Sequence, residues 1–439
     1  MQDKLLHPNL GVIYGFLVIF FLPLKSFVFK FSNLSISPSR FLIFLGVFIA
    51  IIRLLSKRVS LPGSFYNRSY IFLIFFAIFS FCYMLFKYGL NLTFIAQGYS
   101  FFESLVLLPL TFFLLVNPDK YNQVFGYVLR GWVLLIYFAF AQFILDFFGI
   151  NFSFESIGEF APENRAEVFG LSIYRVNSFF GEPRSLASMV ILICIFRAIF
   201  FDRALNPWDW LLMFSIGLLT VSSTFVLGIW ILFASLFLTS SSWMQRLIFL
   251  LIMIVLAFLL GRFYDSIIYA VPRLEIILGL FSLANIETIS GDLAQQISDI
   301  LFLPYILNLE FVSSATGLLG NGLGSSSAIL EEYAFRVFGF SDYALSLKNS
   351  DAQLYGSRIL LFTILLNLGF LGTFLLGLFI YSSLKISSKS FISSKFRAYS
   401  YSLIMVSLLT SSIYFFIVLL IYNSCKRIGH NIQTNHNII

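Results

Sequence analysis

Charged side chains are scarce in this sequence. Asp, Glu, Lys and Arg make up 11% of the 439 residues, whereas 59% are hydrophobic and 19% aromatic. A soluble globular chain carries roughly a quarter charged residues, so the composition excludes an ordinary soluble protein and indicates an integral membrane protein. The net charge of +7 does not indicate nucleic-acid binding, because the basic residues lie in short clusters beside apolar runs, where they set membrane orientation.

Histidine and cysteine are rare as well. The histidines lie near the two ends, at His7, His430 and His436, which leaves none in the loops for metal binding or nucleophile activation. The cysteines lie in or beside apolar runs without metal-ligand spacing, at Cys82, Cys194 and Cys425, and support neither a disulfide frame nor a zinc site. No Walker-type glycine loop is present, so we expect no nucleotide hydrolysis.

Long apolar runs are abundant. A hydrocarbon core of about 30 Å needs about 20 helical residues, and candidate runs lie at about 9–29, 41–55, 69–87, 93–116, 124–149, 183–201, 208–221, 223–239, 245–261, 359–383 and 399–423. Ser222-Ser223 is predicted to open a turn between two helices, because 208–238 is too long for one span. We predict an all-α polytopic membrane protein with about 11–12 transmembrane helices.

Basic residues favour one orientation. With the amino terminus inside, most clusters fall on the cytoplasmic face, at Arg53, Lys57, Arg58, Arg68, Arg197, Arg203, Arg246, Lys385, Lys389, Lys395 and Arg397. Two polar segments, 150–182 and 262–358, then lie outside and hold 15 of the 21 acidic residues. A single last span would place the carboxyl terminus outside, and two half-spans would return it inside.

This orientation predicts the organisation of the chain. Residues 1–261 hold transmembrane helices 1–9 with a first external loop at 150–182, residues 262–358 form a large helical external loop, and residues 359–439 hold the last transmembrane helices. A structured loop of that size is usually functional. We therefore expect the activity at the outer face.

The densest set of external charges precedes the sixth run, where Arg175, Glu182 and Arg184 flank Gly181 and Pro183. Proline suits the first position of a helix, whose free amides favour an anion. Arginine binds phosphate through two parallel N–H groups and keeps its charge in a partly dry site. Alternatively, the arginines only anchor the helix end or pair with Glu182.

A glycine-rich stretch lies late in the large loop, at Gly320, Asn321, Gly322 and Gly324. Its backbone would be able to approach a ligand closely, although an ordinary turn explains the same spacing.

Two further features lie at or within spans. Arg358 precedes the tenth run, in which Gly369 and Gly372 share a helical face suited to helix packing. Glu103 and Arg130 fall on neighbouring spans and form either a functional site or a structural ion pair.

Together these patches resemble the O-antigen polymerase and ligase superfamily of bacterial surface polysaccharide assembly. The matching segments are Arg175 to Ala187 before a span, Ser222-Ser223-Thr224, Gly320 to Gly324, and the start of the tenth span. Ligases carry a His-Asn pair before a Gly-x-x-Gly-Thr motif. Gly369 to Thr373 matches that motif, but Arg358 and Ile359 stand at the pair, which favours the polymerase (Wzy-type) branch.

The resemblance implies a GT-C-like glycosyltransferase without metal or cofactor, in the bacterial cytoplasmic (inner) membrane with its active site facing the periplasm. It would join oligosaccharide units carried on undecaprenyl pyrophosphate. Its partners would be that substrate, membrane lipid and a chain-length regulator protein, with no nucleic acid. A ligase acting on lipid A-core, and a lipid-linked sugar flippase or other transporter, remain as alternatives.

The resemblance also assigns roles to the candidate residues. Arg175, Glu182 and Arg358 are expected to be catalytic, and Glu182 is the candidate that orients or deprotonates the acceptor hydroxyl. Family members often carry an arginine upstream of the glycine segment, where this chain has Gln296, Ile297 and Ser298. The expected pyrophosphate ligands are therefore Arg175, Arg184, Arg358, Arg336 and Arg273. The glycine segment would approach the glycan.

Overall fold

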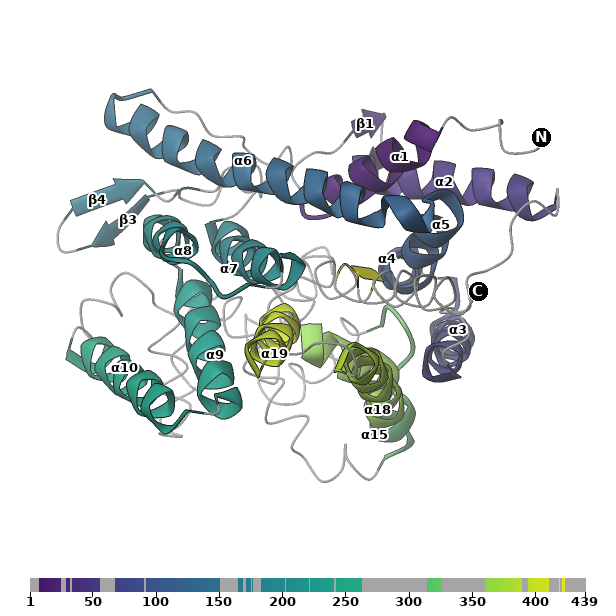
Figure 1. Cartoon of the computed structure of the whole chain (residues 1–439). Coiled ribbons are helices and arrows are strands. Elements are labelled where there is room, and N and C mark those ends of the chain that lie inside the picture. The colour runs from purple at the N-terminus through teal and green to yellow at the C-terminus, as the bar shows by residue number, and fades with distance from the viewer. Residues whose placement is uncertain are drawn as a thin grey trace, which may run out of the picture.

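The computed structural model describes residues 8–24, 29–31, 34–55, 68–90, 92–150, 165–168, 171–174, 176, 183–201, 203–220, 222–240, 242–262, 314–325, 360–388, 394–409, 418 and 421–422. These residues are predominantly helical (Figure 1). The expectation of a helical membrane protein is confirmed in this coarse form.

The helices follow the predicted runs closely. The first half of the chain forms α1 (Pro8–Phe21), α2 (Pro38–Leu55), α3 (Arg68–Tyr88), α4 (Leu92–Phe102), the π-helix η2 (Glu103–Leu107), α5 (Leu108–Leu115), the 3-10 helix η3 (Pro118–Lys120) and α6 (Tyr121–Phe147). The second half forms α7 (Pro183–Phe200), α8 (Pro207–Leu219), α9 (Ser223–Thr239), α10 (Trp243–Arg262), α15 (Ala315–Leu319), α18 (Leu360–Ser388) and α19 (Ser394–Leu409).

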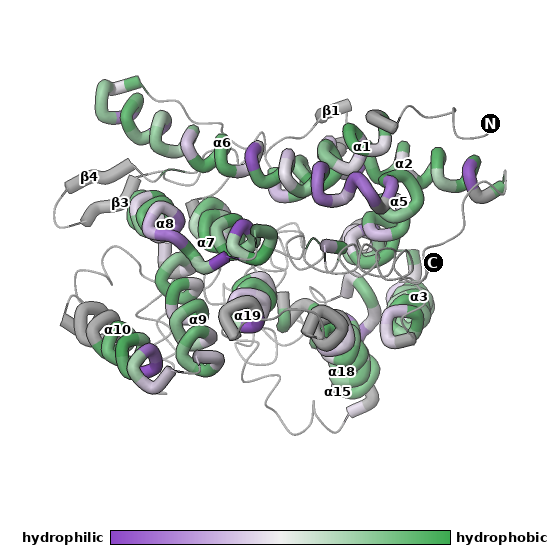
Figure 2. Tube along the Cα trace, in the orientation of Figure 1, coloured by the Kyte–Doolittle hydropathy of each residue, from purple (hydrophilic) through white to green (hydrophobic). Residues whose placement is uncertain are grey.

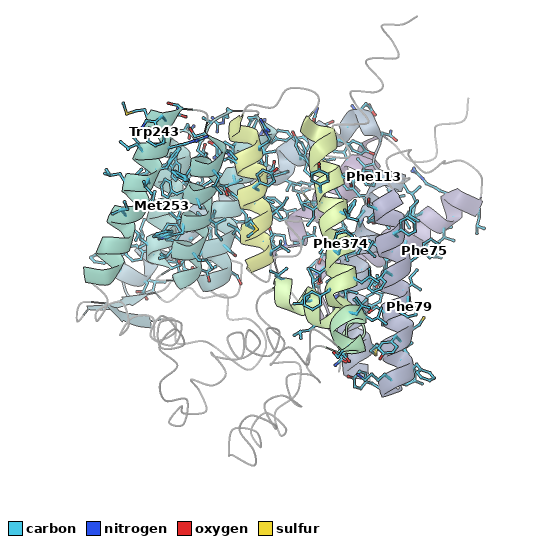
Figure 3. All side chains as sticks on the ribbon, turned by 90° about the horizontal axis from the view of Figure 1, so that it is seen from below. Phe75, Phe79, Phe113, Trp243, Met253 and Phe374 are labelled. Atoms are coloured by element: carbon cyan, nitrogen blue, oxygen red, sulfur yellow. The ribbon has the colours of Figure 1, made fainter. Side chains whose placement is uncertain are left out.

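Length and composition suit these helices to a bilayer. Within the described residues, four segments are long and apolar enough to cross one: Ser69–Tyr88, Gly98–Leu115, Tyr121–Phe147 and Ile364–Ser382. Hydrophobic residues dominate along the helices (Figure 2). Large apolar side chains also cover the outside (Figure 3), with 66% of Phe75 and 61% of Phe374 exposed. An apolar outer surface of this kind is unfavourable in water, so it supports a lipid environment.

Two short hairpins accompany the helices, and the helical class holds. Strand β1 (Phe29–Phe31) pairs antiparallel with β2 (Leu34–Ile36), and β3 (Arg165–Val168) pairs antiparallel with β4 (Leu171–Tyr174). Only two residues join the strands of each pair, which is the commonest hairpin connection. Segments of three or four residues are too short for the helical and apolar patterns to reveal.

The first helix is shorter than its apolar run predicted. The run extends to about residue 29, but α1 ends at Phe21. The N–H groups of Leu22 and Leu24 donate to Ile19 O at 3.3 Å and Phe21 O at 3.1 Å, as in turns. Pro23 accounts for the stop, because it has no N–H and disfavours helical conformation at the preceding residue.

Two predicted boundaries are confirmed. Helix α7 begins at Pro183. The run around Ser222 is two helices, because α8 ends at Leu219 and Ser222 Oγ accepts the N–H of Thr224 at 3.3 Å as the N-cap of α9. A serine in extended conformation at this position satisfies a free amide of the new helix.

Ion pairs and hydrogen bonds of one buried aspartate stabilise the connection between α7 and α8. Asp209 is fully buried and lies 2.9 Å from Arg197 Nη1 and 3.3 Å from Arg203 Nη2. Its backbone N–H donates to Asn206 Oδ1 at 2.7 Å, and its carboxylate accepts the N–H of Asn206 at 3.2 Å. This capping box satisfies free amides at the start of α8.

Candidate functional site

The glycine-rich segment Gly320–Ser325 is buried between α3 and α18. Three of its amides donate to helix carbonyls: Asn321 N to Leu366 O at 2.9 Å, Gly322 N to Asn367 O at 3.2 Å, and Leu323 N to Ser80 O at 3.2 Å. The segment therefore joins two helices through its backbone.

Helix α18 is broken where this segment meets it. Gly369 has φ +64° and ψ −170°, a conformation that does not belong to a helix. The break deprives nearby carbonyls of their usual i+4 partners, and the amides of Asn321 and Gly322 supply replacements at Leu366 and Asn367. Irregular backbone inside a membrane protein is tolerated where other protein groups satisfy it in this way.

The two glycines at the contact interlock. A Cβ on Gly320 would lie 2.3 Å from Asn367 O, and a Cβ on Gly369 would lie 2.4 Å from Gly320 N. Gly320 also has φ +80° and ψ 177°, a region that essentially only glycine occupies. Both positions therefore require glycine for space and for conformation.

The glycine predictions are partly corrected. The close backbone approach predicted for Gly320–Gly324 occurs, but among the described residues it is made to α3, α4 and α18. Gly369 does not share a continuous helical face with Gly372, because the helix breaks at Gly369. Gly372 does serve packing, since a Cβ there would lie 2.7 Å from Phe76 Cε1 of α3.

A lysine that the sequence reasoning missed lies beside this segment. Lys87, in the last turn of α3, donates from Nζ to Asn321 Oδ1 at 2.7 Å. Its ammonium also lies 5.1 Å from the centre of the Tyr88 ring. The sequence offered one signal, because the predicted orientation places Lys87 outside, against the usual bias of basic residues.

Most of the predicted charged site lies outside the described residues, namely Arg175, Glu182, Arg273, Arg336 and Arg358. Arg184 is placed by its backbone alone, in the first turn of α7.

The chain next to two of these residues is described. The N–H of Val176 donates to Leu219 O at 3.4 Å, which holds the chain directly after Arg175 against the end of α8. Helix α18 begins at Leu360, shortly after Arg358.

The starts of α7 and α18 lie at the same end of the helix bundle. Leu205, shortly after α7, donates its N–H to Tyr399 Oη near the start of α19 at 3.0 Å, so α19 begins where α7 ends. Helix α18 packs against α19 and leads into it through residues 389–393, so its end also lies there.

The glycine segment marks this same end of the bundle. It contacts the first turns of α18 and the last turns of α3. In Figure 3, α3 passes from Phe75 to Phe79 toward that end. Three patches that are distant in the sequence are thus brought to one end of the protein.

The buried acid Glu103 has a different partner from the one considered. Its Oε2 lies 3.1 Å from Arg40 Nε, with 5% of the Glu103 side chain and 37% of the Arg40 side chain exposed. Arg130 is exposed on α6, so of the two alternatives the structural ion pair between Glu103 and Arg130 does not form. Glu103 lies on the π-helix η2, a distortion that occurs often at functional sites.

Within the described residues, no three His, Cys, Asp or Glu side chains gather as a metal site would require. Comparison with protein-family models finds none that matches this sequence, and comparison with curated proteins finds no match either.

Proposed function

We propose that this protein is a membrane glycosyltransferase of the O-antigen polymerase type. It joins oligosaccharide units carried on undecaprenyl pyrophosphate at the periplasmic face of the bacterial inner membrane. A GT-C-like arrangement suits this reaction, because the lipid tail of the substrate stays in the bilayer while the glycan is handled at its edge.

One observation carries the proposal. The start of α7, the start of α18 and the glycine segment lie at one end of the bundle. These are three of the patches that resemble the polymerase and ligase superfamily. The start of α7 precedes the other two patches by more than a hundred positions, so the three would not share an end by necessity. Their position at one end supports the proposal of a common site that includes Arg175, Arg184 and Arg358.

The chemistry follows from the substrate. An acceptor sugar hydroxyl attacks the anomeric carbon of the donor glycan, the bond from that carbon to the diphosphate oxygen breaks, and undecaprenyl pyrophosphate leaves with the electron pair. The hydroxyl proton passes to a base, for which Glu182 is the candidate. Fixed arginines stabilise the charge that develops on the leaving group, and their planar donors suit phosphate oxygens.

A transporter is a second candidate, because two structural features favour it. Helix α18 is broken at Gly369 within a candidate span, and transporters commonly build their binding sites on broken helices. The ion pair between Glu103 and Arg40 joins α2 to a second candidate span, where charges often mark transport pathways. The glycine segment donates hydrogen bonds to the carbonyls beside the break in α18, which favours a structural role for the break.

The surface polysaccharide of a deletion strain separates these functions. A polymerase predicts loss of the long-chain ladder while a single capped repeat unit is retained on the core. Loss of all glycan from the core would indicate a ligase. Accumulation of lipid-linked units at the cytoplasmic face would indicate a flippase and overturn the proposal.

A further inference from the structure

Lys87 is a positively charged group that the described residues hold in place without neutralising it. The ion pairs seen in the described part of the chain join Arg40 to Glu103, and Arg197 and Arg203 to Asp209. Lys87 instead has a neutral partner, the side-chain oxygen of Asn321 at 2.7 Å. Among the described residues, no carboxylate pairs with Lys87, so none of them offsets its charge at the end of α3.

The position of the ammonium is well defined. Asn321 is only 3% exposed, and its own N–H donates to Leu366 O of α18 at 2.9 Å. The face of the Tyr88 ring lies 5.1 Å from Nζ and adds a weak attraction for the cation. An ammonium has three N–H donors, and the described residues accept one of them, at Asn321, which leaves donors for an oxygen ligand within that part of the chain.

The surroundings point to an anionic ligand. The segment that holds Lys87 binds the first turns of α18, and Arg358 directly precedes that helix in the sequence. The start of α7, with Arg184, lies at the same end of the bundle. A diphosphate diester carries two negative charges and several acceptor oxygens, and lysine binds phosphate as a point charge.

We propose that Lys87 binds the diphosphate of the lipid-linked substrate and that Asn321 is its positioning residue. This inference rests on the proposed function, because it assigns a further ligand to the same leaving group. The competing explanation is a lysine that only extends its charged head to the membrane surface and fastens the glycine segment to α3.

Two substitutions separate these explanations. Lys87→Met removes the charge and the hydrogen bond together. Asn321→Asp keeps an oxygen for Lys87 but adds a carboxylate that neutralises it, so the glycine segment stays attached while the diphosphate site loses its charge. A purely structural role predicts that Asn321→Asp is as active as the wild type. Two further variants are controls. Lys87→Arg preserves the charge, and Lys120→Met removes a lysine from η3, near the opposite end of the bundle.

The experiment uses the purified full-length protein in lipid nanodiscs. Binding of undecaprenyl pyrophosphate is measured by titration, and polymer growth is measured with lipid-linked repeat units. We expect Lys87→Met and Asn321→Asp each to weaken diphosphate binding by about 10- to 100-fold, as for loss of a charge-assisted hydrogen bond. Lys87→Arg should remain within a few fold of the wild type, and Lys120→Met should be unchanged.

Wild-type binding and polymerisation by both Lys87→Met and Asn321→Asp would overturn this inference and leave the proposed function standing. An active Asn321→Asp beside a defective Lys87→Met would assign Lys87 to the structural role and also overturn it. A wild-type protein that neither binds undecaprenyl pyrophosphate nor lengthens glycans would instead contradict the proposed function itself, and this inference with it.

Discussion

Replacing Gly320 with alanine should release the glycine segment from the broken helix α18. The new Cβ would lie 2.3 Å from Asn367 O and 2.6 Å from Gly369 N, so backbone must move. Strain at a glycine-only conformation costs about 1–3 kcal/mol, and overpacking costs a further 1–3 kcal/mol or so. Separation would also remove the hydrogen bonds from Asn321 and Gly322, each contributing about 1 kcal/mol. Together these terms lower the local stability by about 4–8 kcal/mol.

Hydrogen exchange measures this loss directly. The amides of Asn321, Gly322 and Leu323 are bonded to helix carbonyls, and they should exchange far faster in the Gly320→Ala protein than in the wild type. Gly377→Ala is the matched control on α18, because a Cβ there meets nothing within 4 Å. That substitution should leave exchange unchanged and raise helix stability slightly. Equal protection in both variants would refute the interlocking of Gly320 with Gly369.

Four further substitutions test other parts of the protein. Arg40→Met leaves the buried Glu103 carboxylate unpaired and should lower the unfolding free energy in detergent by about 2–3 kcal/mol, below the value for a fully buried pair because Arg40 is partly exposed. Asp209→Asn leaves two arginines without their counter-charge and should cost about 3 kcal/mol by the same measurement. Arg175→Ala and Arg358→Ala should each abolish polymer growth in cells at normal protein abundance, as seen on a polysaccharide gel with an immunoblot.

Matched variants make these outcomes specific. Combining Arg40→Met with Glu103→Leu should recover most of the lost stability, because no buried charge remains; an additive double mutant would contradict the pairing. Arg203→Gln should cost less than Asp209→Asn, since Arg203 is partly exposed. Arg246→Ala, on α10, should leave polymer length unchanged, whereas long chains persisting in both Arg175→Ala and Arg358→Ala would rule out the proposed arginine site.

The elements that sequence reasoning located correctly are those set by local chemistry. Pro183 starts α7 because its fixed φ suits the first helical position. Ser222 separates α8 from α9 because its hydroxyl caps the new helix. Apolar length alone located the other long helices, although Pro23 ends α1 earlier than hydrophobicity suggested.

The parts that sequence reasoning missed depend on contacts between distant residues. The conformation of Gly369 follows from its contact with Gly320, 49 positions earlier. The partner of Glu103 is Arg40 from α2, across 63 positions, and not the arginine on a neighbouring span. In the sequence, Lys87 is an ordinary basic residue at a helix end. Only the fold brings Asn321 into hydrogen-bond contact with it. No local pattern records these pairings.

Reconstitution provides the most direct test of the central claim. Purified protein in liposomes, supplied only with repeat units on undecaprenyl pyrophosphate, should yield glycans of stepwise increasing length. Each new glycosidic bond should release one molecule of undecaprenyl pyrophosphate. Units that move across the bilayer without lengthening, with no release of undecaprenyl pyrophosphate, would contradict the account and identify a transporter.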